Sequence, residues 1–176
     1  MTKTTAVARP RAAARAMDDA STGDPAIQVL RRFRLVFNAV KTHFRQVEKK
    51  AGLGGAQVWA LAVVRDRPGI GVSELARAMD IHQSTASNLI RALVEQELVA
   101  ASKTGTDRRA VQLRVLPAGG RVLKRAPAPF TGVLPEALRS LDRPTLKRLD
   151  RDLARLIELL GGDERAAHLP LSDDIG

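Results

Sequence analysis

The fold is decided by residues Val72 to Val99, VSELARAMDIHQSTASNLIRALVEQELV. The spacing predicts two short helices, the first over Ser73 to Met79 and the second beginning near Gln83. Asp80-Ile81-His82 is the predicted turn between them, and Ser73 is the predicted N-cap of the first helix. Apolar residues recur at spacings of three and four, which places them on one side of each helix. They are Leu75, Ala76 and Met79, then Ala86, Leu89, Ile90, Leu93 and Val94.

The opposite side of the second helix is polar. It carries Ser84, Ser87, Asn88 and Arg91, with Gln83 at the helix start. Small hydroxyls, an amide and a guanidinium are groups that contact base edges and phosphates in a major groove. The segment therefore matches the helix-turn-helix pattern. Polar helix faces are also common on ordinary solvated surfaces, so the next segment of the chain has to distinguish the two possibilities.

A charged hairpin is predicted directly after these helices. Leu98 to Ser102 has extended character, and Val111, Leu113 and Val115 alternate with polar residues as in a half-buried strand. The predicted tip carries the cations Lys103, Arg108 and Arg109. A cationic tip of this kind fits a narrow minor groove, although a surface hairpin with ordinary charges is the alternative.

The charge of the chain favours a polyanionic partner. The net charge of the 176 residues is +10, a balance typical of proteins that bind nucleic acid or an acidic membrane surface. The excess is uneven, because residues 24–50 carry a net charge of +5 and residues 68–116 only +1. No cysteine is present, which excludes disulfides and thiol chemistry. No apolar run approaches the roughly 20 residues of a membrane span.

The segment before the helix-turn-helix predicts a long helix with an apolar seam. Asp24-Pro25 is a helix start and Gly52 a stop. Between them apolar residues follow heptad spacing, which requires an apolar partner from the same chain or a second copy. The seam comprises Leu30, Phe33, Phe37, Val40, Phe44 and Val47. Residues 55–65 predict a further helix that contains Trp59, and Ile70 to Val72 a short strand.

The C-terminal third predicts more helix. An apolar stripe over residues 123–141 is interrupted by Pro127, Pro129 and Pro135, so we expect a bent helix or two pieces. Asp142 is predicted to cap a final helix that ends at Gly161-Gly162. Its apolar stripe is Leu146, Leu149, Leu153, Leu156, Ile157 and Leu160.

Taken together, these segments resemble the MarR-type family of winged helix-turn-helix regulators. The residues that carry the resemblance are 72–99 and DRRAVQLRVLPAGGRVL at 107–123. Asp107-Arg108-Arg109 fits the Asp-x-Arg of the family's wing, and Pro117-Ala118-Gly119-Gly120 keeps the glycine of its Thr-x-x-Gly but has proline for threonine. Asn88 and Glu97 stand where many members have arginine and glycine, so a shifted base preference and a different helix exit are expected.

The resemblance implies a homodimer on double-stranded DNA. Ser84, Thr85, Ser87 and Asn88 would face the major groove, Arg109 would enter the minor groove, and Asp107 would orient the wing. The first helix and the last two helices would pack across the two-fold, adding Leu153, Leu156, Ile157 and Leu160 to the seam. A small aromatic or anionic effector would enter a cleft near His43 or Trp59.

These expectations define the fold class as mainly α with a small β-hairpin, a winged helix-turn-helix core plus a helical dimerisation region. The predicted segments are a flexible basic tail (1–23), a dimerisation helix (24–51), the DNA-binding domain (52–116), C-terminal dimerisation helices (117–162) and a frayed tail (163–176). The basic tail has the alternative of an arm that touches the DNA backbone.

The function expected is a cytoplasmic transcriptional repressor that a small ligand releases from a pseudo-palindromic operator. A nucleoid-type architectural protein is the alternative. The sequence does not favour an enzyme, because it has no phosphate-cradling glycine loop and no HExxH. Glu164 and His168 are spaced for a metal but lack further ligands, so neither a metal nor a cofactor is expected.

Overall fold

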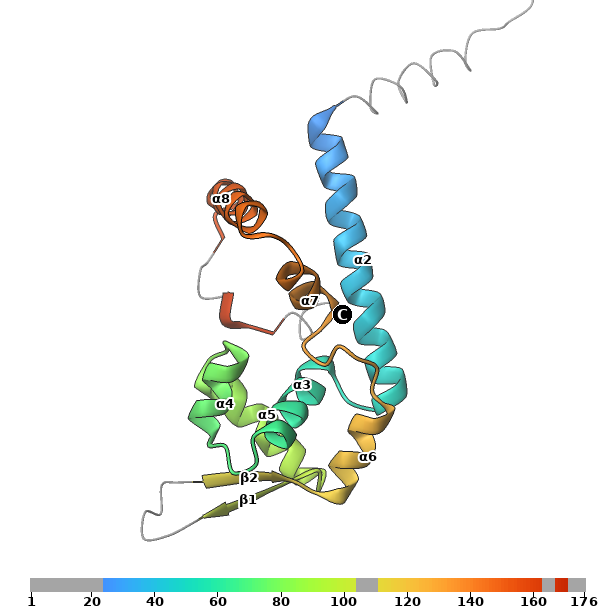
Figure 1. The fold of residues 1–176 in the computed structure, drawn as a ribbon, viewed down its shortest axis with the longest axis vertical. Helices are drawn as coiled ribbons and strands as arrows, with labels where there is room; N and C mark the ends of the chain where they lie inside the picture. Colours follow the sequence, from blue (N-terminus) through green and yellow to red (C-terminus); the bar gives the residue numbers. More distant parts are fainter. Residues whose placement is uncertain (1–23, 104–110, 163–166, 171–176) are drawn as a thin grey trace, which may run out of the picture. The chain divides into compact units, whose positions relative to one another are not determined.

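The computed structural model describes residues 24–103, 111–162 and 167–170 (Figure 1). The helices are α2 (Pro25–Ala51), α3 (Gly55–Asp66), α4 (Val72–Met79), α5 (Gln83–Glu95), α6 (Pro117–Arg125), α7 (Val133–Arg139) and α8 (Arg143–Leu160). The strands β1 (Val99–Lys103) and β2 (Val111–Val115) form an antiparallel hairpin. This confirms the mainly α fold with a small hairpin. The chain divides into two units, Met1–Ala39 and Val40–Gly176, so that α2 contributes to both.

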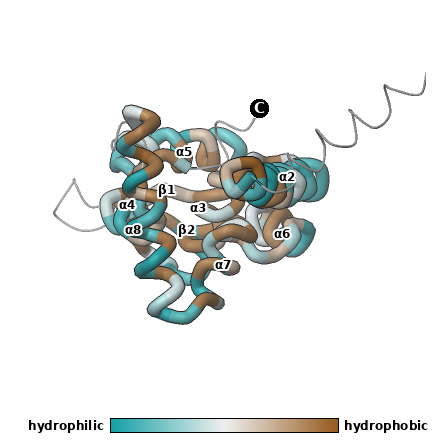
Figure 2. The backbone as a smooth tube through the Cα atoms, turned by 90° about the horizontal axis from the view of Figure 1, so that it is seen from above, coloured by the Kyte–Doolittle hydropathy of each residue, from teal (hydrophilic) through white to brown (hydrophobic). Residues whose placement is uncertain are grey.

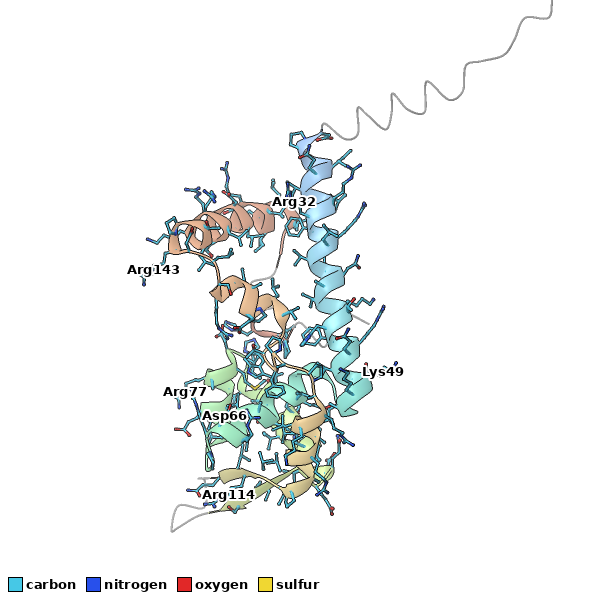
Figure 3. All side chains as sticks on the ribbon, turned by 45° about the vertical axis from the view of Figure 1, so that its right-hand side comes forward. Arg32, Lys49, Asp66, Arg77, Arg114 and Arg143 are labelled. Carbon is cyan, nitrogen blue, oxygen red and sulfur yellow. The ribbon has the colours of Figure 1, made fainter. Side chains whose placement is uncertain are left out.

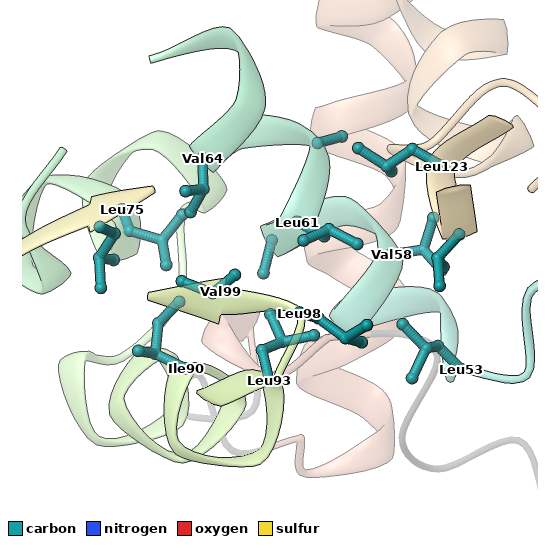
Figure 4. Close-up of a cluster of buried hydrophobic side chains, with 14 of the residues drawn as sticks. Leu53, Val58, Leu61, Val64, Leu75, Ile90, Leu93, Leu98, Val99 and Leu123 are labelled. Atoms are coloured by element: carbon teal, nitrogen blue, oxygen red, sulfur yellow. The ribbon is translucent and has the colours of Figure 1, made fainter. Parts of the chain in front are cut away.

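The core of the second unit is built around α3, which contacts α4, α5, α6 and β2. Val58, Leu61 and Val64 of α3 are completely buried (Figure 4). Leu75, Leu93 and Leu113 from the surrounding elements are also fully buried and belong to the same cluster. Each such side chain contributes roughly 1.5–3 kcal/mol through burial. One apolar cluster therefore holds the two predicted helices and the hairpin together.

The hairpin keeps the alternation read from the sequence. Val99 pairs with Val115 and Ala101 with Leu113, and Leu113 is buried while Arg114 is exposed. The strand predicted over residues 70–72 is wrong, because α4 already begins at Val72. The backbone of residues 69–70 instead borders β2: the Gly69 N–H donates to the Leu113 carbonyl at 2.8 Å, and the Leu113 N–H donates to the Ile70 carbonyl at 3.1 Å.

Most helix ends follow the predicted capping residues. Asp24 Oδ1 accepts from the Ala26 N–H at 2.8 Å, and Asp142 Oδ1 accepts from the Thr145 N–H at 2.7 Å. Ser73 does not cap α4, since Gly71 is the N-cap and its N–H donates to Glu74 Oε2 at 3.1 Å. The proline-rich stretch separates α6 from α7, so the C-terminal apolar stripe forms two pieces.

Two helices expose apolar side chains that the rest of their own unit leaves uncovered. In the first unit, Leu30 is 49% and Phe37 is 58% exposed, and the rings of Phe33 and Phe37 stack at 6.3 Å. In the second unit, no described residue of α8 is buried, and Leu160 is 74% exposed. The hydropathy along both helices can be followed in Figure 2. None of the described helices combines the length and the apolar character needed to cross a bilayer.

Part of the predicted seam of α2 is covered within the second unit. Val40 is only 4% exposed and Phe44 is half-buried, and both line a cavity within their own unit. Val47 is 2% exposed and belongs to the core cluster. The part of the seam that is open to a partner is therefore the stretch from Leu30 to Phe37.

Candidate nucleic-acid interface and the neighbouring cavity

The turn between α4 and α5 sets the direction of the second helix. Asp80 adopts a left-handed conformation (φ 53°) directly after α4, and the Ile81 N–H donates to the Ala76 carbonyl at 3.0 Å. His82 is the N-cap residue of α5, but its side chain makes no capping hydrogen bond. Ala86, Ile90 and Leu93 are buried as predicted, whereas Val94 is 37% exposed because it lies at the edge of the apolar stripe.

The outward face of α5 presents the predicted polar residues. Gln83, Ser84, Asn88 and Arg91 are exposed, and Thr85 and Ser87 are half-buried. The Ser87 hydroxyl donates to the Gln83 carbonyl at 2.8 Å, so its lone pairs are the part left to accept from a ligand. The first turn of α5 contains no acidic residue. The backbone N–H groups of this turn therefore form the positive end of the helix, and no acidic side chain of the turn offsets it.

A groove beside the start of α5 adds residues that sequence reasoning missed. Its polar lining includes Ser73 and Glu74 from α4, Gln83 and Ser87 from α5, and Gln112 from β2. Two exposed arginines, Arg77 of α4 and Arg114 of β2, are further cations of the same unit (Figure 3). Residues this far apart in sequence could not be assembled into one surface from helical or strand periodicity alone.

The predicted wing residues are only partly covered by the structure. The pairing of Lys103 with Val111 is the last described step of the hairpin. Asp107, Arg108 and Arg109 lie outside the described residues, as does the position of the Lys103 side chain. The structure thus describes the hairpin that carries this segment, and the roles of its side chains stay predictions.

A cavity of about 210 Å³ lies behind the helix-turn-helix in the second unit. Its aromatic lining comes from Phe44 of α2, Trp59 of α3 and Phe130 in the connection between α6 and α7. Met79, Asp80 and Ile81, the end of α4 and its turn, form another wall. The remaining lining is Val40, Gly55, Ala56, residues 131–135, Ala167, Leu169 and Pro170. Trp59 thus lines a cavity, and its role toward an effector stays a prediction.

His43, the other residue proposed for that cleft, is not part of the cavity lining. It is 7% exposed, and its Nε2 has no partner among the described residues. The ring is also within reach of a hydrogen bond with the backbone of Pro129. Burial lowers the pKa of His43, and the hydrogen bond to Pro129 offsets part of that effect. His43 is therefore a buried packing residue whose neutral form is favoured by its surroundings.

The segment 167–170 was expected to be frayed, but the structure places it against the helix-turn-helix. The His168 ring packs edge-on against His82 at 5.3 Å, and its Nδ1 lies 3.4 Å from the Asp80 carbonyl oxygen. Pro170 is buried, and Leu169 borders a groove with Thr85 and Asn88 of α5. Among the described residues, no group of three acidic, histidine or cysteine side chains is arranged to hold a metal ion.

Comparison with known proteins gives a consistent result. Residues 51–110 match the model of the MarR family. A putative transcriptional regulatory protein for the hcr operon of Thauera aromatica is 30% identical over 87 residues, which is 49% of this chain and 52% of that protein. The chain therefore spans about half the length of the curated relative it matches.

Solved structures agree at the level of the fold. A MepR-like protein complexed with pseudoligands has a TM-score of 0.53 at 19% identity, covering 77% of this chain and 96% of that one. The MepR–DNA complex of S. aureus has a TM-score of 0.52 at 18% identity, covering 73% and 94%. The helix-turn-helix, its hairpin and these matches lead to one conclusion: the described residues have the winged helix fold, and residues 51–110 are similar to the MarR family.

Proposed function

We propose that the chain is a sequence-specific transcriptional regulator that binds duplex DNA as a homodimer. The observation that carries the proposal is the outward face of α5, where Ser84, Asn88 and Arg91 are exposed on a helix whose other side is fixed in the core. The Thauera relative is described as a transcriptional regulatory protein, and the S. aureus MepR structure is a DNA complex. Both descriptions support the proposal without extending to the identity of the operator.

The chemistry of the face suggests how bases are read. An asparagine amide pairs in bidentate fashion with the N6 and N7 atoms of adenine, so Asn88 favours adenine in each half-site. Ser84 offers a hydroxyl that both donates and accepts. Arg91 and the start of α5 suit phosphates, which supply affinity but no sequence information.

The hairpin supplies the second contact in this proposal. Arg109 enters the minor groove, with Lys103 and Arg108 near the backbone and Asp107 orienting the segment. This part rests on the sequence motif and on the hairpin that flanks it. The removal of one phosphate-neutralising cation lowers the salt slope of binding by about one unit, so Arg109→Ala tests it directly.

The proposal of a dimer is supported by the apolar surfaces that each unit leaves open. Leu30 and Phe37 on α2, and Leu156, Ile157 and Leu160 on α8, are all more than one-third exposed. Exposed large apolar residues at heptad spacing are typical of an interface between subunits. A two-fold dimer places two copies of α5 on half-sites about 10 bp apart, centre to centre.

Regulation by a small molecule is the third part of the proposal. The cavity shares Met79, Asp80 and Ile81 with the turn that leads into α5. A ligand that fits only when this wall moves would shift the position of α5, the helix proposed to read DNA. The ligand would then change the affinity for DNA, and DNA would change the affinity for the ligand by the same factor. Release of a repressor from its operator is the outcome that fits this geometry.

The experiment is selection from a random duplex library by the purified protein, followed by sequencing. A specific regulator returns one short pseudo-palindrome with the predicted half-site spacing. Recovery of fragments without a shared sequence would instead support the nucleoid-type alternative. Binding to the selected site is then measured by fluorescence anisotropy against a scrambled duplex at several salt concentrations.

A matched pair of variants tests the role of α5. Asn88→Ala should weaken binding to the selected site by about 1–3 kcal/mol and leave the scrambled duplex almost unaffected. Asn38→Ala, which changes another exposed asparagine, this one on α2, is the control and should change neither. Equal losses on both duplexes in Asn88→Ala would show that α5 does not read sequence.

A further inference from the structure

We infer that residues 167–170 form a displaceable strap over the start of α5 and compete there with DNA. The strap consists of Ala167, His168, Leu169 and Pro170. Its role rests on the function proposed above, in which α5 reads DNA. All the contacts that support it lie within the second unit of the chain.

His168 covers the entrance to α5. Its ring packs edge-on against the ring of His82, with the two centroids 5.3 Å apart. His82 is the N-cap residue of α5. The Nδ1 atom of His168 also lies 3.4 Å from the carbonyl oxygen and 3.6 Å from the Oδ1 atom of Asp80, in the turn before α5. One side chain of the strap therefore contacts both ends of the turn between α4 and α5.

Leu169 extends the strap along α5. It borders a groove whose other walls include Gln57 near the start of α3 and Thr85 and Asn88 of α5. Thr85 and Asn88 belong to the face proposed to read bases, and such reading brings the base edges within hydrogen-bond distance of these side chains. A duplex that reaches Asn88 would meet Leu169 at the edge of the same groove. The strap therefore has to leave for the duplex to bind.

The strap is held weakly enough to be displaced. Pro170 is its one buried residue, whereas Ala167, His168 and Leu169 are exposed, Leu169 by 46%. The polar contact of 3.4 Å between His168 and Asp80 is long for a hydrogen bond. A segment with so few buried contacts opens locally while the core stays folded. The opposite side of α5 is fixed by Ile90 and Leu93 in that core, so the helix keeps its place when the strap leaves.

Two substitutions in the full-length chain should loosen the strap. His168→Ala removes the contacts with the turn, and Leu169→Ser removes an apolar side chain from the groove. A strap that is docked about 90% of the time lowers the apparent DNA affinity about tenfold. Each variant should therefore bind the selected duplex at least about threefold more tightly than the unmodified protein in fluorescence anisotropy. Gln46→Ala, an exposed position on α2 in the same unit, is the control and should leave the affinity unchanged.

Fixing the strap in place should have the opposite effect. Because the chain has no cysteine, the double variant His82→Cys/His168→Cys has two thiols, at the positions whose rings pack together. A short bifunctional thiol reagent should link them, which intact mass measures. The linked protein should bind the selected duplex at least about tenfold more weakly than the same variant before linking. His82→Cys alone, treated in the same way, measures the effect of the reagent itself, and circular dichroism compares the folds.

Three results would overturn the inference. They are unchanged or weaker DNA binding in both loosened variants, failure of the two thiols to be linked, and a linked protein that binds DNA as tightly as the unlinked one. A protein that binds its selected duplex and gives any of these results retains the regulator proposal and loses the strap. If the unmodified protein and the loosened variants all bind no duplex, the proposed function fails, even where the link forms.

Discussion

Two adjacent glycines at the start of α6 should respond in opposite ways to alanine. A Cβ built on Gly119 overlaps the Leu98 carbonyl oxygen and lies 3.0 Å from side-chain carbons of Leu61 and Val115. The nearest contact is a backbone atom, well inside ordinary van der Waals separation. A Cβ on Gly120 meets nothing within 4 Å. The two positions therefore differ in packing while sharing the same helix.

The magnitudes follow from this geometry. Alanine in place of glycine inside a helix gains about 0.8–1 kcal/mol of propensity. Overpacking against a fixed neighbour costs about 1–3 kcal/mol, and the clash with a carbonyl that already accepts from the Leu116 N–H at 2.9 Å belongs to the upper part of that range. Gly119→Ala should thus lose about 1–2 kcal/mol of unfolding free energy, and Gly120→Ala should gain up to about 1 kcal/mol.

Urea denaturation and thermal denaturation, both followed by far-UV circular dichroism, measure the two variants beside the unmodified chain. The two melting temperatures should separate by several degrees, since about 2–4 °C accompanies each kcal/mol in a domain of this size. Equal stabilities for the two variants would refute the close approach of α6 to the end of α5 and the start of β1. A loss of unfolding free energy in Gly120→Ala alone would mean that the tight contact lies at Gly120 and not at Gly119.

Three further perturbations test separate parts of the fold. Glu97 has a left-handed φ of 56°, so Glu97→Gly should raise the unfolding free energy by up to about 1 kcal/mol. Glu95→Gly within α5 is the control and should lower the unfolding free energy. A lower unfolding free energy in Glu97→Gly would contradict this reasoning. The lowered pKa of buried His43 means that the unfolded chain binds more protons below about pH 6.5. Stability should fall as the pH drops from about 7.5 to 5.5, and His43→Phe, but not His168→Asn, should flatten that slope. Phe37→Glu should convert a dimer to monomers in light scattering while the adjacent Asn38→Glu does not, and a dimer that survives Phe37→Glu would reject α2 as the interface.

Local sequence patterns predicted the elements around the helix-turn-helix because each was specified by its own residues. The start of α5 at Gln83, the hairpin and the caps at Asp24 and Asp142 all depend on periodicity or on one side chain next to a helix end. Ser73 failed as a cap because Gly71 and Glu74 satisfy the same need two residues earlier. Alternative capping arrangements of this kind differ too little in free energy for the sequence to show which one forms.

Tertiary arrangement explains what periodicity missed. The heptad spacing of α2 assigned Val40 and Phe44 to the same seam as Leu30, yet both line the cavity of the second unit. A helix shows only which residues share a face, and the neighbour that each part of the face meets depends on the rest of the chain. The groove that unites Ser73, Gln83 and Gln112 was hidden for the same reason.

The turn after α4 explains why the small cavity and the helix proposed to read DNA would act together. Ile81 lines the cavity, its N–H is tied to Ala76, and the next residue but one begins α5. Leu169 belongs to the lining of the cavity and also borders the groove beside Thr85 and Asn88. Because packed interiors yield little to compression, a ligand that overfills about 210 Å³ has to displace a wall. The walls formed by the turn and by residues 167–170 are short segments, whereas α3 is fixed on several sides by the core. Displacement should therefore reach the start of α5 first, which is the helix proposed to read DNA.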